Sequence, residues 1–174
     1  MGASLYPHAG ASAARELDTP MSRYTATIRW ARDNKPFLDN RYSRAHEWQF
    51  DGGLTIPASS SPHVVPEPQS VAFNVDPEEA FVASVSSCHM LWFLSLAARK
   101  GFVVDSYDDD AVGVMEKNAD GKVAITHVTL RPRVNCASGT APSESDMLAL
   151  HHMAHAKCYI ANSVKTEIHI EPVW

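Results

Sequence analysis

Cysteine is scarce in this chain, and its three cysteines stand far apart. Cys88, Cys136 and Cys158 are too few, and odd in number, for a disulfide framework. They include no close Cys-x-x-Cys pair, the usual pattern of a structural zinc site. Residues 1–20 also lack the apolar centre of a signal sequence. Together these absences lead us to expect a reducing, cytoplasmic setting.

Basic residues are in the minority as well. Lysine and arginine number 15 against 20 acidic residues, which gives a net charge of −5. No basic stripe interleaved with aromatic residues is present, although nucleic-acid-binding proteins usually carry a concentrated basic patch. We therefore expect no nucleic-acid partner.

Charge is missing altogether between Ala80 and Ala98. This run is long enough to suggest a membrane span, but serine, cysteine and histidine side chains interrupt it. We therefore interpret it as a central soluble helix and expect no membrane partner. A helix that is apolar on most faces is buried on most faces. In a chain this small, such burial predicts a homodimer.

Enough apolar material is present for one core. The chain has 174 residues, of which 45% are hydrophobic, and this fits a single domain. Residues 1–20 are rich in alanine, glycine and serine, and Met21 is a plausible second start. We therefore expect a flexible extension at 1–20, a single domain at 21–174, and no internal repeats.

Alternating apolar and polar residues predict most of the strands. Asp51-Gly-Gly53 predicts one hairpin, and Asn118 to Gly121 joins two long strand-like runs into a second. The predicted strands lie at 24–30, 46–50, 54–56, 102–115, 122–134 and 164–171. Segregated antiparallel strands with two helices indicate an α+β protein.

The start of the first helix is well marked. Asp76 can cap it, Pro77 suits its first position, and Glu79 completes a capping box. Gly101 suits the left-handed cap beyond its end. Before it, the proline-rich residues 57–70 predict a loop that could form a wall of a site.

The second helix is predicted to begin at Ser143. Its residues Met147, Leu150, Ala154 and Cys158 recur at steps of three or four and fall near one face. Cys158 should therefore point inward, toward the core or toward the first helix.

Two cysteines in separate helical segments indicate thiol chemistry more than a metal clip. The segments around Pro77–Glu79, Cys88 and Cys158 resemble the OsmC/Ohr family of thiol-dependent peroxidases, and the resemblance spans roughly residues 24–171. It implies the OsmC-like fold, an intertwined homodimer and no bound cofactor. It also implies reduction of organic hydroperoxides, with an external dithiol, a lipoyl or thioredoxin-like protein, as reductant.

The resemblance implies a role for each cysteine. Cys88 would be the nucleophile that becomes a sulfenic acid, and Cys158 would resolve it as a disulfide. Cys136 lies outside both segments and is treated as a bystander. Because Cys88 lies well beyond the first turn of its helix, the helix dipole cannot acidify it, and a cation must do so.

In the family, an arginine is that cation, and a glutamate at the start of the cysteine helix holds it. Arg44, which precedes a strand, is the preferred match, with Arg41 and then Arg32 as alternatives. Glu78 is the preferred glutamate because it lies within about 80° of the Cys88 face, about 15 Å away along the helix. That separation requires a long arginine bridge or a glutamate from the neighbouring chain.

Other readings remain open at this stage. Apolar substrates would be favoured by a pocket lined with Phe81, Trp92, Phe93 and Tyr159. His89 is placed near this substrate pocket, but it is better suited to helix packing than to catalysis. The same fold could instead bind a small hydrophobic or thiol-reactive ligand without turnover. His151, His152, His155 and Cys158 could bind a metal, but no full ligand set accompanies them, so we expect no metal.

Overall fold

The structure, a computed structural model, describes residues 22–174. The extension predicted at residues 1–20 lies outside the described residues. The described part is an α+β fold in which strands, a long helix, a long hairpin, a second helix and a last strand follow in order. The elements are β1 (Ala26–Arg29), β2 (His46–Phe50), β3 (Thr55–Ala58), α1 (Pro77–Arg99), β4 (Val104–Asp109), β5 (Val112–Lys117), β6 (Val123–Leu130), β7 (Pro132–Cys136), α2 (Glu144–Lys157), η1 (Ala161–Ser163) and β8 (Glu167–Ile170).

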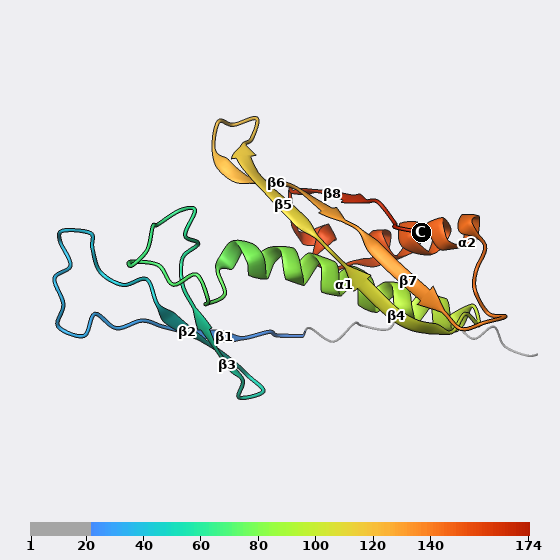
Figure 1. Ribbon diagram of the computed structural model, residues 1–174, viewed down its shortest axis with the longest axis horizontal. Helices are drawn as coiled ribbons and strands as arrows, with labels where there is room; N and C mark the ends of the chain where they lie inside the picture. Colours follow the sequence, from blue (N-terminus) through green and yellow to red (C-terminus); the bar gives the residue numbers. More distant parts are fainter. Residues whose placement is uncertain (1–21) are drawn as a thin grey trace, which may run out of the picture.

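Helix α1 runs through the middle of the molecule (Figure 1). The predicted capping box is confirmed, because Asp76 accepts from the Glu79 amide at 2.7 Å and the Glu79 side chain reaches back to the Asp76 amide. Gly101 follows the helix with φ +81°, a conformation that glycine adopts without strain. Ser143 caps α2 as predicted.

The long hairpin is confirmed, but it is bent into two ladders. Strand β5 pairs with β6, and β4 pairs with β7. The Asp109 carboxylate lies at the bend and accepts from the Arg131 amide at 2.6 Å and from the Ser86 hydroxyl at 2.5 Å. The bend is therefore fastened to the middle of α1. Strand β8 adds to β6 in parallel, so this sheet is not wholly antiparallel.

Two apolar clusters hold α1 against the rest of the body. One joins α1 to α2, and the other joins α1 to β6. The first comprises Phe93, Leu96, Ala97, Met147, Leu150 and Ala154, and the second Val85, Val128 and Leu130.

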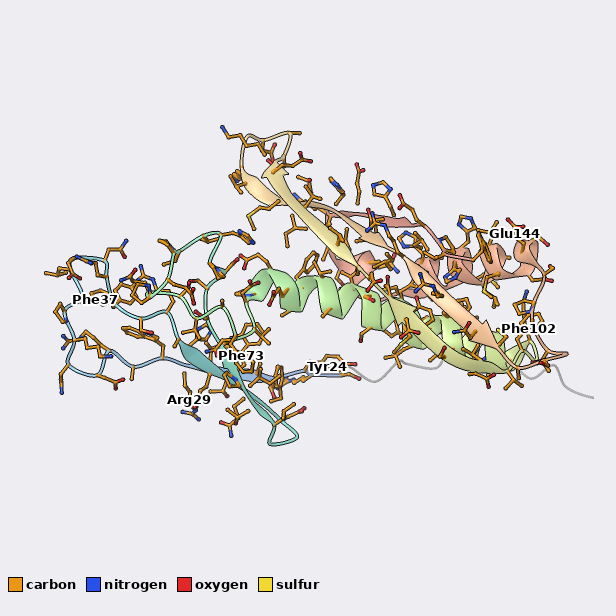
Figure 2. All side chains as sticks on the ribbon, viewed as in Figure 1. Tyr24, Arg29, Phe37, Phe73, Phe102 and Glu144 are labelled. Atoms are coloured by element: carbon orange, nitrogen blue, oxygen red, sulfur yellow. The ribbon has the colours of Figure 1, made fainter. Side chains whose placement is uncertain are left out.

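The three-stranded sheet β1–β2–β3 lies apart from the other sheets (Figure 1). Figure 2 shows Phe37, in the loop between β1 and β2, at one end of the molecule and Phe102, beyond α1, at the other. All four residues of β1 are exposed. In a single chain this sheet therefore covers little of the body.

Helix α1 leaves much apolar surface uncovered. It is long and apolar enough, by length and composition, to cross a membrane, a test that core helices also pass. Within the chain, 28% of its most apolar window is buried. Its uncovered stripe contains Glu79, Ala83, Ser87 and Leu91, four residues apart along one face.

Replacing Gly113 with alanine should destabilise the fold. A Cβ atom on this β5 residue would lie 2.6 Å from Val82 Cγ2 on α1 and 3.3 Å from Ile125 Cγ2 on β6. Such overpacking of a tight contact costs about 1–3 kcal/mol. The urea midpoint of Gly113→Ala should therefore fall below that of the wild type. The control is Gly52→Ala, where nothing lies within 4 Å; equal midpoints for the two variants would contradict the prediction.

Candidate active site

The structure brings Cys88 and Cys158 together. Cys88 lies midway along α1 and is partly exposed, whereas Cys158 is the C-cap of α2 and 1% exposed. The two thiols interact, and neither cysteine forms a disulfide. Burial, and then the interaction with Cys88, raise the pKa of Cys158 to about 11. Cys158 is therefore protonated near neutral pH.

An open groove of about 510 Å³ runs beside Cys88. Its far wall is aromatic, with the Trp92 and Tyr159 rings meeting edge to face at a centroid separation of 5.5 Å. The predicted pocket residues Trp92 and Tyr159 therefore line it. The full lining is Ser84, Ser87, Cys88, Leu91, Trp92, Ser95, Tyr159 and Ile160.

Three other residues considered for this pocket lie elsewhere. Phe81 packs against the cluster between α1 and β6, and Phe93 is fully buried between α1 and α2. His89 is 1% exposed and faces α2. For His89 the helical repeat explains this placement, because it is one position from the groove-lining Cys88 and is turned by about 100° around the helix.

A buried histidine pair joins the two cysteine helices. His89 Nε2 and His151 Nδ1 are 3.0 Å apart, with the rings nearly parallel. Burial, followed by His151 and His155, lowers the pKa of His89 to about 3. Burial, followed by His152, lowers the pKa of His151 to about 4. Both imidazoles are therefore neutral at physiological pH.

Of the histidines on the second helix that were considered as metal ligands, His151 is buried. His151 is 2% exposed, and its ring stacks on Phe93 at 4.4 Å. The sequence position of His151, one residue after the apolar Leu150, was a signal that His151 is buried. Nothing in the sequence identified His89 as its partner. Within residues 22–174 no group of three histidine, cysteine or acidic residues is arranged to hold a metal.

Arg44 is held in its own loop. Its guanidinium donates to the Asn40 carbonyl at 3.1 Å, to Asn40 Oδ1 at 2.8 Å and to the Tyr42 carbonyl, and it stacks on the Tyr42 ring at 3.7 Å. Tyr42 in turn stacks on Phe37 at 4.5 Å. In a single chain, contacts within this loop therefore hold the Arg44 side chain against the Tyr42 ring, and they do not bring it to Cys88. Arg41 donates its amide to Asp39 and is exposed.

Glu78 also stays apart from Cys88. It lines a second groove, of about 970 Å³, on the other side of the uncovered stripe of α1. Ser61, His63 and Val64 from the predicted loop form part of its wall. Ser87 borders both grooves, so they flank one continuous uncovered face of α1. In one chain the predicted arginine, glutamate and thiol thus remain separate.

Comparison with known proteins identifies the family. The family profile described as OsmC-like protein matches residues 70–173, well over half of the chain. The chain belongs to the OsmC-like family. A solved OsmC-like protein of unknown function from Vibrio cholerae is 54% identical, with a TM-score of 0.86, and the match covers 88% of this chain and 100% of that one. No curated protein matched the sequence.

More distant members of the OsmC-like family share the fold. The organic hydroperoxide resistance protein OhrB of Bacillus subtilis superimposes with a TM-score of 0.62 at 19% identity, over 87% of this chain and 98% of that one. An OsmC-like protein from Mycoplasma pneumoniae gives 0.66 at 14% identity, over 87% and 96%. The expected OsmC-like fold is therefore confirmed.

Proposed function

We propose that this protein is a thiol-dependent peroxidase that reduces organic hydroperoxides through Cys88 and Cys158. One observation supports this most strongly: the partly exposed Cys88 borders an apolar groove and its thiol interacts with that of the buried Cys158. The names of several structural neighbours as organic hydroperoxide resistance proteins agree with it.

The proposed cycle balances with two thiols and one external dithiol. The Cys88 thiolate attacks the outer peroxide oxygen, the O–O bond breaks, and the alkoxide takes a proton and leaves as the alcohol. Cys88 is then a sulfenic acid. The Cys158 sulfur attacks the Cys88 sulfur and expels water, which forms the disulfide. An external dithiol restores both thiols and is itself oxidised.

Activation of Cys88 is proposed to need a second copy of the chain. Arg44 would lower the pKa of Cys88 and orient the peroxide, and Glu78 would position that arginine. Two features support a homodimer in which these residues meet. The sheet β1–β2–β3 lies apart from the body while bearing exposed apolar residues such as Ile28, and the grooves beside Glu78 and Cys88 flank an uncovered helix face.

The groove suggests a preference for organic substrates. Leu91, Trp92 and Ile160 offer apolar contacts, which hydrogen peroxide is too small and too polar to use. Cumene hydroperoxide should therefore be turned over faster than hydrogen peroxide. Equal kcat/KM values for the two would remove this preference.

The decisive experiment is the intact mass of the reduced protein before and after one equivalent of cumene hydroperoxide, with peptide mapping. We expect the loss of two hydrogen atoms, mapped to a Cys88–Cys158 bridge, with the peroxide consumed. A Cys136→Ser control should give the same result. An unchanged mass with unconsumed peroxide would contradict the proposal.

A second candidate is ligand binding without turnover. It is favoured by the Arg44 guanidinium, whose donors are engaged within its own loop. The same groove would then hold a small hydrophobic or thiol-reactive ligand. A Cys88→Ser variant that retains affinity, in a protein whose wild type consumes no peroxide, would support this candidate over the first.

A further inference from the structure

A lone lysine stands at the edge of the thiol groove. Lys157 is the last residue of α2 and is exposed, and its Nζ lies 5.5 Å from the centroid of the Trp92 ring. Trp92 forms the groove wall together with Tyr159. The ammonium group is therefore placed over an aromatic wall that also faces the thiol pair. Such a contact holds a cation in place without neutralising it.

Among the described residues, no acidic side chain forms an ion pair with this ammonium group. Within residues 22–174 the ion pairs join His127 to Glu116, Arg131 to Glu171 and His169 to Glu167. The two segments that build the groove, 80–98 and 147–166, contain no aspartate or glutamate. The charged residues of these two segments, Lys157 and Lys165, are both basic, in a chain whose net charge is −5.

An ordinary structural role does not account for this position fully. A lysine in the last turn interacts favourably with the negative end of the helix dipole, and its stem can cover apolar surface. Neither the interaction with the helix dipole nor the covering of apolar surface requires the Lys157 side chain to point toward Trp92. The contact with Trp92 instead directs the charge to the wall of a groove that contains both a thiol and an apolar lining.

We propose that Lys157 binds the carboxylate of an amphiphilic substrate whose apolar body lies along Trp92 and Leu91. The preferred substrates are then hydroperoxides that carry a carboxylate, in place of neutral ones of the same size. The inference rests on the proposed peroxidase function for its kinetic test. Its binding test is independent of that function.

The kinetic test compares linoleic acid hydroperoxide with its methyl ester, which differs only in charge and a methyl group. The wild type should favour the acid by about five-fold in kcat/KM at low salt, the size expected for an exposed ion pair. Because the thiols are untouched, the difference should appear in KM. High salt should reduce it, since exposed charges are screened.

Three variants isolate the charge. Lys157→Met keeps the length and should equalise the acid and the ester, whereas Lys157→Arg should keep the preference. Lys165→Met removes an exposed lysine beyond η1 and should behave as the wild type. Turnover of both substrates with an acid-to-ester ratio that Lys157→Met leaves unchanged would overturn the proposal.

The binding test uses linoleic acid and methyl linoleate with the Cys88→Ser protein, by calorimetry below the micelle concentration. The acid should bind more tightly, and adding Lys157→Met should remove the difference. If wild-type protein turns over no hydroperoxide, the proposed function fails, yet this experiment still decides the role of Lys157. Equal affinities for acid and ester with Lys157 present would overturn it.

Discussion

Replacing Cys88 with serine should abolish hydroperoxide turnover, lowering kcat/KM by at least about a thousand-fold, as removal of a nucleophile does in other enzymes. Serine matches the shape of cysteine, but its hydroxyl is not deprotonated at neutral pH, and a peroxide is attacked by a thiolate. The measurement is cumene hydroperoxide consumption with a dithiol reductant in excess. Circular dichroism of the variant should match that of the wild type, because residue 88 is only half-buried.

The other cysteines serve as matched controls for this experiment. Without added dithiol, Cys158→Ser should still consume one equivalent of peroxide and then accumulate a Cys88 sulfenic acid that a 1,3-diketone probe traps as a stable thioether, with no Cys88–Cys158 bridge. Cys136→Ser should retain full turnover, because Cys136 lies at the end of β7 and packs against the core between α1 and α2. Turnover that survives in Cys88→Ser but is lost in Cys136→Ser would reassign the nucleophile.

Acidification from pH 7 to 5 should destabilise the protein by a few kcal/mol through the His89–His151 pair. The folded-state pKa values, about 3 and about 4, lie below the ordinary value of 6.5. Unfolded chains therefore take up protons below pH 6.5 that the folded protein does not. The stability is fully present above that pH and is lost as the pH falls, by about 1.4 kcal/mol per pH unit for each histidine.

Urea unfolding at fixed protein concentration, from pH 7.5 to 5, measures this loss. His151→Leu should reduce the slope of stability against pH by about half, whereas His63→Leu, at an exposed position outside both helices, should leave the slope unchanged. In the folded wild type, NMR should show neither buried imidazole titrating between pH 7 and 5. A pH slope that is identical in the wild type and His151→Leu, or a buried imidazole that titrates near 6.5, would contradict the prediction.

Local signals in the sequence correctly predicted where the helices begin and where the long hairpin turns. Asp76, Pro77 and Glu79 define the start of α1 through contacts between residues at most three apart, so the sequence contains all the information needed. The same holds for the turn at Asn118–Gly121 and for the cap at Ser143. The inward direction of Cys158 followed from the helical repeat and is confirmed by its burial.

The site was harder to predict because its partners come from distant parts of the chain. The contact of His89 with His151 joins two helices, and no pattern within either helix specifies it. Phe81 resembled a pocket residue because apolar side chains line grooves and cores alike. A single chain keeps Arg44 and Glu78 apart from Cys88, so their roles remain predictions.

The backbone at Cys88 is more constrained than the backbone at Cys158. Cys88 lies within 23 residues of continuous helix, whereas Cys158 ends α2 and is followed by the short turn η1. Moving Cys88 would require breaking backbone hydrogen bonds on both sides of it, but Cys158 can shift with the few residues that follow. Any rearrangement that accompanies bond formation between Cys88 and Cys158 should therefore be confined to residues 158–163. The backbone of α1 should keep its position.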